Sequence, residues 1–267
     1  MHPTFEIFNR TIGSYAVFAL VGFAACAAVI ALSCKKLKIT FEDVIILMLI
    51  VACGLVVGGH LLYGIVNAPQ AISAFESTKN TSVKQMLKIL ISQFGGLVFY
   101  GGFLGGLAAL WIYNKNTNAV YKDKIFDIYA FSIPLFHTFG RIGCFFAGCC
   151  YGIKSEFGFV VNHNSLVPDV CGVKRFPVAL LESLCNLILF IIIFTLFRKN
   201  KFSGKLILVY MITYPVIRFW VEFLRGDTAR GIFFGLSTSQ WISIVLLMCA
   251  AIKLVLIKIK RLENNKI

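Results

Sequence analysis

The sequence predicts an all-α integral membrane protein of about seven transmembrane helices, with its N-terminus outside and its C-terminus cytoplasmic. Of the 267 residues, 58% are apolar and 14% are charged, whereas a soluble domain carries roughly a quarter charged residues. The mean hydropathy is +0.83. The apolar residues gather in runs long enough to cross a bilayer, which takes about 20 residues. Lipid is therefore expected to cover most of the surface.

Apolar runs follow one another along the chain, separated by short polar stretches. The predicted spans are residues 14–34, 42–66, 89–113, 126–148, 178–197, 204–224 and 238–258. No stretch between them is long enough for a soluble domain, so residues 1–267 are expected to form a single polytopic membrane domain. No small-residue cleavage site follows the first run, which is expected to stay in the protein as a span.

The distribution of Lys and Arg predicts the orientation of these spans. The loops at 35–40, 114–124 and 198–205 and the tail from 253 carry 15 of the 26 basic residues, and the N-terminus and remaining loops carry nine. The more basic side is expected to be cytoplasmic. The net charge of +14 thus belongs to short loops near anionic head groups. Without a continuous basic face it does not predict nucleic-acid binding.

Two basic residues, Arg141 and Arg218, fall inside predicted spans. A mid-membrane arginine costs about 2.5–3.5 kcal/mol even on the lenient insertion scale, so it usually faces the bundle interior and has a partner. Glu222 follows Arg218 by one helical turn, and Arg225 can share their face. Glu182 is a further candidate partner.

A guanidinium group matches a phosphate bidentately, so two buried arginines favour a phospholipid substrate or ligand. The structural alternative is that Arg218 snorkels to the surface, or that Arg218 and Glu222 form an ion pair that only holds helices together.

Two segments, 94–106 and 140–152, are rich in glycine. Small residues at four-residue spacing let membrane helices approach closely, which accounts for much of the first segment. In the second segment the glycines flank Arg141 and continue to the outer end of the span. Irregular backbone at such depth is tolerated where it lines a cavity, so this segment predicts a substrate chamber.

From about residue 10 to residue 260 the chain resembles the prolipoprotein diacylglyceryl transferase family. The strongest match is Gly140-Arg141-Ile142-Gly143 followed by Gly148 and Tyr151-Gly152, which is similar to the signature around the family's essential arginine. The family's Arg-x-x-x-Glu-x-x-Arg motif is matched by Arg218, Glu222 and Arg225, and the Glu that ends another motif by Glu182. Weaker matches are Tyr15 with Leu20 to Phe23, Gly58-Gly59, Gly95-Gly96 and Gly101-Gly102.

The resemblance implies a reaction in the bacterial inner (cytoplasmic) membrane. These enzymes transfer the diacylglyceryl group of phosphatidylglycerol to the lipobox cysteine thiol of a preprolipoprotein signal peptide and release glycerol phosphate. The implied catalytic residues are Arg141, Arg218, Glu222 and Tyr100. The implied substrate-binding residues are Tyr15, Gly101, Gly102, Gly140, Gly143, Gly148, Glu182, Arg225 and His137. Neither a cofactor nor a metal is implied.

By the same resemblance, Arg141 and Arg218 would bind the phosphate and stabilise the charge that develops on it. Glu222 would orient Arg218.

The chain departs from the family pattern at positions that are expected to take part in the reaction. Tyr100 stands where the family has a histidine, Cys144 where it has an Asn, and Cys149 where it has a Glu. Alkylation of a thiol is helped by a group that removes its proton, and a phenol is a poor base at neutral pH. His137 and His60 are alternative bases, although each also fits a hydrogen-bonded helix residue. Tyr100 could instead only position the head group.

The loss of the usual histidine and glutamate favours a second function class. In that alternative, a paralogue binds or transports phospholipid, or modifies a different acceptor, without the family activity.

Four cysteines, at positions 144, 149, 150 and 171, admit three interpretations. The favoured one is a disulfide between Cys149 or Cys150 and Cys171, because the outer side is oxidising in bacteria. The cysteines could also bind a metal, but Cys-x4-Cys-Cys without a clear His partner is a weak metal signal. Thiol or acyl chemistry is the third interpretation.

Overall fold

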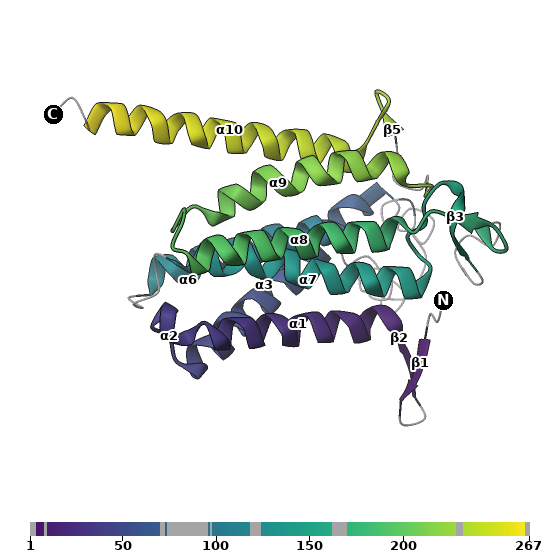
Figure 1. Ribbon diagram of the computed structural model, residues 1–267, viewed down its shortest axis with the longest axis horizontal. Coiled ribbons are helices and arrows are strands. Elements are labelled where there is room, and N and C mark those ends of the chain that lie inside the picture. The colour runs from purple at the N-terminus through teal and green to yellow at the C-terminus, as the bar shows by residue number, and fades with distance from the viewer. Residues whose placement is uncertain are drawn as a thin grey trace. The chain divides into compact units, whose positions relative to one another are not determined.

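The computed structural model describes residues 4–7, 10–69, 73, 96, 98–117, 124–161, 170–227 and 232–264. The chain divides into two compact units, Met1–Val29 with Phe126–Ile267, and Ile30–Ile125. Both units are built from helices, which Figure 1 labels in chain order.

The first unit contains five long helices among its described residues. They are α1 (Ser14–Leu32, of which the part to Val29 belongs here), α7 (Ile125–Ala147), α8 (Val178–Arg198), α9 (Leu206–Val221) and α10 (Thr238–Asn264). A short 3₁₀ turn, Glu222–Leu224, continues α9. Contacts join α8 to α9 and α9 to α10, and these three helices run side by side in Figure 1.

Polar and apolar residues of this unit are arranged as in a protein that is surrounded by lipid. Ile191 on α8 and Trp220 on α9 are exposed, whereas Glu182, Asn186 and Arg218 on the same helices are buried. Charged groups inside a membrane bundle are expected to face its interior, and apolar side chains to face the lipid.

Asp127, in the first turn of α7, fixes the start of α9. Its carboxylate accepts hydrogen bonds from the backbone N–H groups of Gly204 at 2.6 Å and Leu206 at 3.0 Å. The first N–H groups of a helix have no partner within the helix, and a carboxylate satisfies them while complementing the helix dipole. Asp127 is only 1% exposed. This buried contact sets α9 against α7 and so helps to position Arg218.

Short antiparallel strand pairs lie outside the helices in the described part of this unit. β1 (Thr4–Ile7) pairs with β2 (Arg10–Gly13), β3 (Lys154–Val160) with β4 (Lys174–Arg175), and β5 (Ile232–Phe233) with β6 (Leu236–Ser237). The sequence predicted only loops over 151–177 and 225–238. β4, β5 and β6 have only two residues each, too few to produce an alternating pattern of apolar and polar side chains. The seven residues of β3 do not alternate between exposed and less exposed positions either.

The second unit contains α2 (Cys34–Leu37), α3 (Phe41–Val66) and α6 (Phe99–Asn116). A capping box begins α3, because Thr40 Oγ1 accepts from the N–H of Asp43 at 3.2 Å and Asp43 Oδ2 accepts from the N–H of Thr40 at 2.7 Å.

Glycines bring α3 and α6 into close contact. A Cβ at Gly58 would collide with the carbonyl oxygen of Gly101, and a Cβ at Gly105 would collide with the carbonyl oxygen of Gly54. Small residues at four-residue spacing thus allow the two backbones to touch. The packing explanation offered for the glycine segment 94–106 is therefore confirmed for its described residues.

Five described helical segments are long and apolar enough to cross a membrane. They are Ser14–Leu32, Phe41–Val66, Val178–Arg198, Leu206–Leu224 and Thr238–Leu256. Helix α7 coincides closely with the predicted span at 126–148, and α6 overlaps the predicted span at 89–113, but neither is among the five. Residues 89–95 and 97 of the third predicted span lie outside the described residues. Sequence and structure therefore agree on a multi-pass α-helical membrane protein.

Candidate functional site

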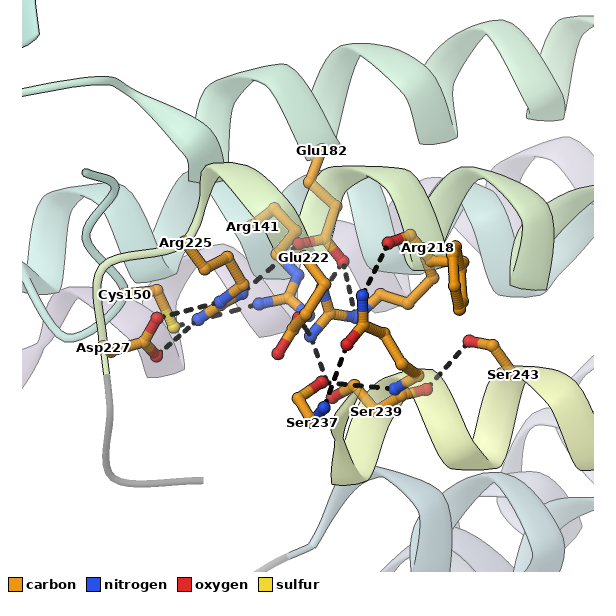
Figure 2. Close-up of polar contacts among 12 residues, drawn as sticks. Arg141, Cys150, Glu182, Arg218, Glu222, Arg225, Asp227, Ser237, Ser239 and Ser243 are labelled. Carbon is orange, nitrogen blue, oxygen red and sulfur yellow. Dashed lines mark hydrogen bonds and ion pairs between the residues drawn. The ribbon is translucent and has the colours of Figure 1, made fainter. Parts of the chain in front are cut away.

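Glu182, near the start of α8, is the centre of a cluster of buried charges (Figure 2). Its side chain is 0% exposed, and its Oε1 lies 2.9 Å from Nη2 of Arg141 on α7. The same oxygen lies 3.9 Å from Nε of Arg218 on α9, and Oε2 lies 3.5 Å from Nη1 of Arg225. Arginines from two distant parts of the sequence, Arg141 and the neighbouring Arg218 and Arg225, therefore converge on one carboxylate.

Arg218 has two further partners within the cluster. Its Nη2 lies 2.5 Å from Oε2 of Glu222, one helical turn along the chain, and donates a hydrogen bond to Oγ of Ser239 on α10 at 3.0 Å. The side chain of Arg218 is 2% exposed, so it does not snorkel to the surface. The ion pair expected between Arg218 and Glu222 is present, and the contacts of Arg218 with Glu182 and Ser239 link α9 to α8 and α10.

Arg225 lies just after the 3₁₀ turn and is held by Asp227. Nε donates to Oδ1 at 2.9 Å and Nη2 donates to Oδ2 at 2.7 Å, which makes a bidentate pair. Burial raises the pKa of the Asp227 carboxyl above its usual value, although the Arg225 guanidinium beside it acts in the opposite direction.

The formal charges of this cluster balance. The positive side chains are Arg141, Arg218 and Arg225, and the negative ones are Glu182, Glu222 and Asp227. Mutual compensation lowers the cost of holding so many charges away from water.

Two donors of the cluster have no acceptor in the described part of the protein. They are Nε of Arg141 and Nη1 of Arg218, and both atoms are buried. A buried polar group without a hydrogen bond costs about 1–3 kcal/mol. An anionic ligand whose oxygen atoms accept from these N–H groups would recover that cost, so the cluster is suited to bind a phosphate.

His137 lies one helical turn before Arg141 and is 5% exposed. Its Nε2 is 4.0 Å from Oε1 of Glu182, and its ring centroid is 5.2 Å from that of Tyr214. The structure therefore brings His137 to the edge of the charge cluster, where its ring borders both Glu182 and Tyr214.

A backbone clip made of three chain segments holds Arg225 in place. Gly152 forms a β-bridge with Arg225, and the N–H of Gly226 donates to the carbonyl oxygen of Tyr151 at 3.0 Å. A Cβ at Gly152 would collide with the carbonyl oxygen of Phe176. Gly152 of the signature is thus needed for close backbone packing.

The other signature glycines have separate local surroundings. Gly143 faces the start of α1, where a Cβ would lie 3.1 Å from Cα of Tyr15. At Gly140 no heavy atom of the described residues lies within 4 Å of the position that a Cβ would take, apart from those of its own turn and neighbours. Gly148 has a φ of 68°, a conformation that glycine adopts without strain. Tyr15 itself is 50% exposed.

Tyr100, Gly101 and Gly102 lie on α6, in the second unit. Gly101 packs against Gly58, and a Cβ at Gly102 would lie 3.0 Å from Cγ of Leu55. Both glycines therefore have a packing role within their unit.

The cysteines form a group that differs from the favoured disulfide. All nine cysteines lie among the described residues, and none of them, Cys171 included, forms a disulfide there. The Sγ atoms of Cys144, Cys149 and Cys150 lie within 4.8 Å of one another, and Nη1 of Arg141 is 3.8 Å from Sγ of Cys150. The expected pairing of Cys149 or Cys150 with Cys171 is absent from the structure, because the turn at Gly148 directs Cys149 and Cys150 towards Cys144.

Sequence reasoning missed three residues of the site. Ser239 contacts Arg218, Asp227 holds Arg225, and Arg175 donates from Nη1 to the carbonyl oxygen of Gly152 at 3.1 Å. Asp227 could have been identified from the order Arg-Gly-Asp at 225–227, because an acidic side chain two positions after an arginine can turn back and contact it. Nothing in the sequence distinguishes Ser239 from other serines.

Comparison with known proteins identifies the family of this chain. The family model described as prolipoprotein diacylglyceryl transferase matches residues 3–256. A phosphatidylglycerol–prolipoprotein diacylglyceryl transferase of Clostridium tetani is 35% identical over 244 residues, which cover 90% of this chain and 91% of the relative. A relative from Clostridium perfringens, named phosphatidylglycerol–prolipoprotein diacylglyceryl transferase 2, is 34% identical over 267 residues, which cover 98% of this chain and 96% of the relative. A phosphatidylglycerol–prolipoprotein diacylglyceryl transferase of Finegoldia magna is 28% identical over 250 residues, which cover 93% of this chain and 92% of the relative. The chain belongs to the prolipoprotein diacylglyceryl transferase family.

Proposed function

We propose that this protein transfers the diacylglyceryl group of phosphatidylglycerol to the cysteine thiol of prolipoprotein signal peptides and releases glycerol phosphate. The observation that carries the proposal is the pair of buried guanidinium groups, Arg141 and Arg218, each of which has an N–H without an acceptor in the described structure. The printed names of the relatives supply the substrate and the reaction.

The phosphate diester of the lipid head group is the ligand for these two arginines. It presents oxygen acceptors to Nε of Arg141 and Nη1 of Arg218, and a guanidinium binds such oxygens with two parallel hydrogen bonds. Glu182 lies 2.9 Å from Arg141 and 3.9 Å from Arg218, and in this proposal it orients both groups before the lipid binds.

During transfer the acceptor sulfur attacks the glyceryl carbon and the bond from that carbon to the phosphate oxygen breaks. Negative charge grows on the phosphate as the thioether forms, and fixed positive charges beside it stabilise the transition state. Glu222 and Ser239 keep Arg218 in place for this task. Arg225 contributes to the positive surroundings, and His137 supports Glu182 from the side of Tyr214.

The remaining sequence-predicted residues take substrate-binding roles in the proposal. For Tyr100, Gly101 and Gly102 on α6, the family resemblance is what supports a role in binding the substrate. Gly140, Gly143 and Gly148 shape the chamber next to Arg141, and the exposed Tyr15 borders it through its approach to Gly143.

The proposal includes a topology. Residues 1–267 act as one polytopic domain with seven spans in the bacterial inner membrane, the N-terminus outside and the C-terminus cytoplasmic. The excess of Lys and Arg in alternate loops supports this orientation, and α6 and α7 supply the two spans beyond the five long apolar ones.

A transfer assay tests the proposal directly. The purified protein is placed in phosphatidylglycerol liposomes with a lipobox peptide, and mass spectrometry follows the peptide thiol. We expect a diacylglyceryl adduct with the wild type, and a loss of at least about 100-fold in rate with Arg141→Ala or Arg218→Ala, since removing one donor to a developing charge costs about that much. Arg198→Ala is the matched control, because Arg198 is exposed at the far end of α8.

Two results would contradict the proposal. One is equal activity of the wild type and both arginine variants. The other is the absence of any adduct from wild-type protein that is folded and holds phosphatidylglycerol, which would favour a lipid-binding or lipid-transport protein instead.

A further inference from the structure

We propose that Cys144, Cys149 and Cys150 bind a zinc ion as a three-sulfur site whose fourth position takes the acceptor thiol. The zinc site stands on the geometry of the cysteines alone. Its role in activating the acceptor rests on the transferase function proposed above.

The three sulfur atoms are already close to the spacing that zinc requires. All three Sγ atoms lie within 4.8 Å of one another, and those of Cys149 and Cys150 are 3.8 Å apart. A zinc–sulfur bond is about 2.3 Å long, so two sulfur ligands in a tetrahedral site are about 3.8 Å apart. The cysteines need to close by at most about 1 Å to bind the ion.

The backbone creates this spacing by ending a helix at the right place. On a continuous helix, residues five apart point roughly 140° away from each other, because each residue turns about 100°. Helix α7 ends at Ala147, and Gly148 follows with a φ of 68°. The turn brings Sγ of Cys149 to 3.7 Å from the carbonyl oxygen of Cys144. The three thiols therefore converge within one short stretch of the chain, residues 144–150.

The donor set favours a thiophilic metal. Only sulfur atoms make up the group in the part of the chain that the structure describes. Thiolate ligands select zinc and copper(I) over hard cations such as magnesium and calcium. Three protein ligands with an open fourth position are typical of catalytic zinc, whereas structural zinc has four protein ligands.

Charge and access also suit an open zinc site. Three thiolates and one zinc ion carry a net charge of −1, and Nη1 of Arg141, 3.8 Å from Sγ of Cys150, offsets it. Cys144 is buried, Cys150 is half-buried and Cys149 is exposed, so a peptide can approach the ion from the side of Cys149.

Tyr100 is a poor base and does not readily convert the acceptor thiol to a thiolate. A bound zinc ion supplies that conversion. A thiol that coordinates zinc loses its proton, which passes to water. The bound sulfur then attacks the glyceryl carbon, the carbon–oxygen bond breaks, and the phosphate oxygen keeps the electron pair. The product is a neutral thioether, a weaker ligand that leaves the ion. Arg141 reaches both Cys150 and Glu182, so the activated sulfur and the phosphate lie close together.

Metal binding is tested first, without any reference to activity. The protein is purified in detergent under reductant, its zinc is measured, and cobalt(II) is exchanged in to give sulfur-to-cobalt absorption. We expect about one ion per chain in the wild type, as in other single zinc sites, and little or none in Cys149→Ser, whose exposed position leaves the fold intact. Cys171→Ser, a free cysteine outside the group, is the matched control and should retain the ion.

Fully reduced wild-type protein that binds neither zinc nor cobalt would overturn the site. Equal metal content in Cys149→Ser and Cys171→Ser would also overturn it, because the ion would then lie elsewhere.

The role of the acceptor is tested next by adding the lipobox peptide to cobalt-loaded protein. Coordination of the peptide thiol should change the cobalt spectrum, and the same peptide with Ser in place of Cys should not. Removal of the metal should lower transfer by at least about 100-fold, the upper part of the range for an acid–base contribution, and zinc should restore it.

An unchanged cobalt spectrum, or full transfer by metal-free protein, would overturn the activating role. If the peptide changes the spectrum but zinc-loaded wild type transfers nothing, the transferase proposal fails while coordination of the acceptor stands. The two proposals can therefore fail separately.

Discussion

At the scale of single residues, the central feature is that one carboxylate serves three guanidinium groups. Glu182 is completely buried and lies within 4.0 Å of Arg141, Arg218 and Arg225. Removing its charge leaves three arginines opposite two carboxylates, and an uncompensated buried charge is expensive.

Glu182→Gln keeps the shape of the side chain and removes its charge. We expect a loss of about 3–5 kcal/mol of stability, the cost of breaking a buried ion pair, together with loss of transfer. Unfolding in mixed micelles measures the stability. Glu156→Gln, at an exposed position of β3, should change stability by no more than about 0.5 kcal/mol. Equal stabilities of the two variants would show that Glu182 does not compensate the arginines.

Ser239 tests whether the orientation of Arg218 matters for the reaction. Ser239→Ala removes the hydrogen bond to Nη2 of Arg218, and a hydrogen bond to a charged group contributes about 1.5–3 kcal/mol. We expect kcat to fall by about tenfold or more, with KM less affected. Ser243→Ala is the control, since Ser243 is also buried and its hydroxyl donates to the carbonyl oxygen of Ser239. If both variants slow the reaction equally, the effect comes from the packing of α10.

Part of this site could be predicted from the sequence. Charges within apolar runs are costly, so the positions of Arg141 and Arg218 alone predicted that both belong to a site. The four-residue spacing of Arg218 and Glu222 predicted their contact. The contact between Cys144 and Cys149 could not be predicted, because it depends on the backbone angle at Gly148. Ser239 is a neutral side chain of a common type, and only the fold brings it to an arginine.

At the scale of helices, the glycines between α3 and α6 fix the distance between two backbones. The contact involves carbonyl oxygens and not flexible side chains, so an added side chain cannot be accommodated by a change of rotamer. Overpacking of this kind costs about 1–3 kcal/mol or more.

Gly105→Leu should therefore separate α3 from α6 and destabilise the protein by more than about 2 kcal/mol. Ala108→Leu adds similar bulk on the exposed side of the same helix and should have little effect. Thermal unfolding in detergent compares the two variants. The close-packing explanation of this glycine motif fails if Gly105→Leu is as stable as Ala108→Leu.

Helices were far easier to predict than the strands that connect them. The predicted spans at 178–197 and 204–224 agree closely with α8 and with α9 plus its 3₁₀ turn, because about 20 consecutive apolar residues leave little choice of structure in lipid. Helix α10 runs to Asn264, beyond the predicted end at 258, since a helix can continue in water after the apolar run has ended. Backbone contacts at glycines hold β3 against β4, and no pattern of side chains in the sequence predicts such contacts.

At the scale of the whole molecule, the proposed orientation gives a paired prediction. A protease site placed before Thr4 should be cut in intact spheroplasts, and a site placed after Asn264 should be cut only in inverted vesicles. The expectation follows from the excess of basic residues in alternate loops. Cleavage of both sites from the same side would mean an even number of spans and would exclude the seven-span topology.

The charge cluster has a consequence for how a lipid enters it. Because the arginines and carboxylates already cancel one another, an arriving phosphate does not fill an empty positive hole. It accepts hydrogen bonds from Nε of Arg141 and Nη1 of Arg218, which have no acceptor in the described structure, and it shares both guanidinium groups with Glu182. Affinity for the head group is then the gain from these new hydrogen bonds less the weakening of the internal ion pairs. Such a site releases its phosphate product easily, since the internal carboxylates still compensate the guanidinium groups after the product has left.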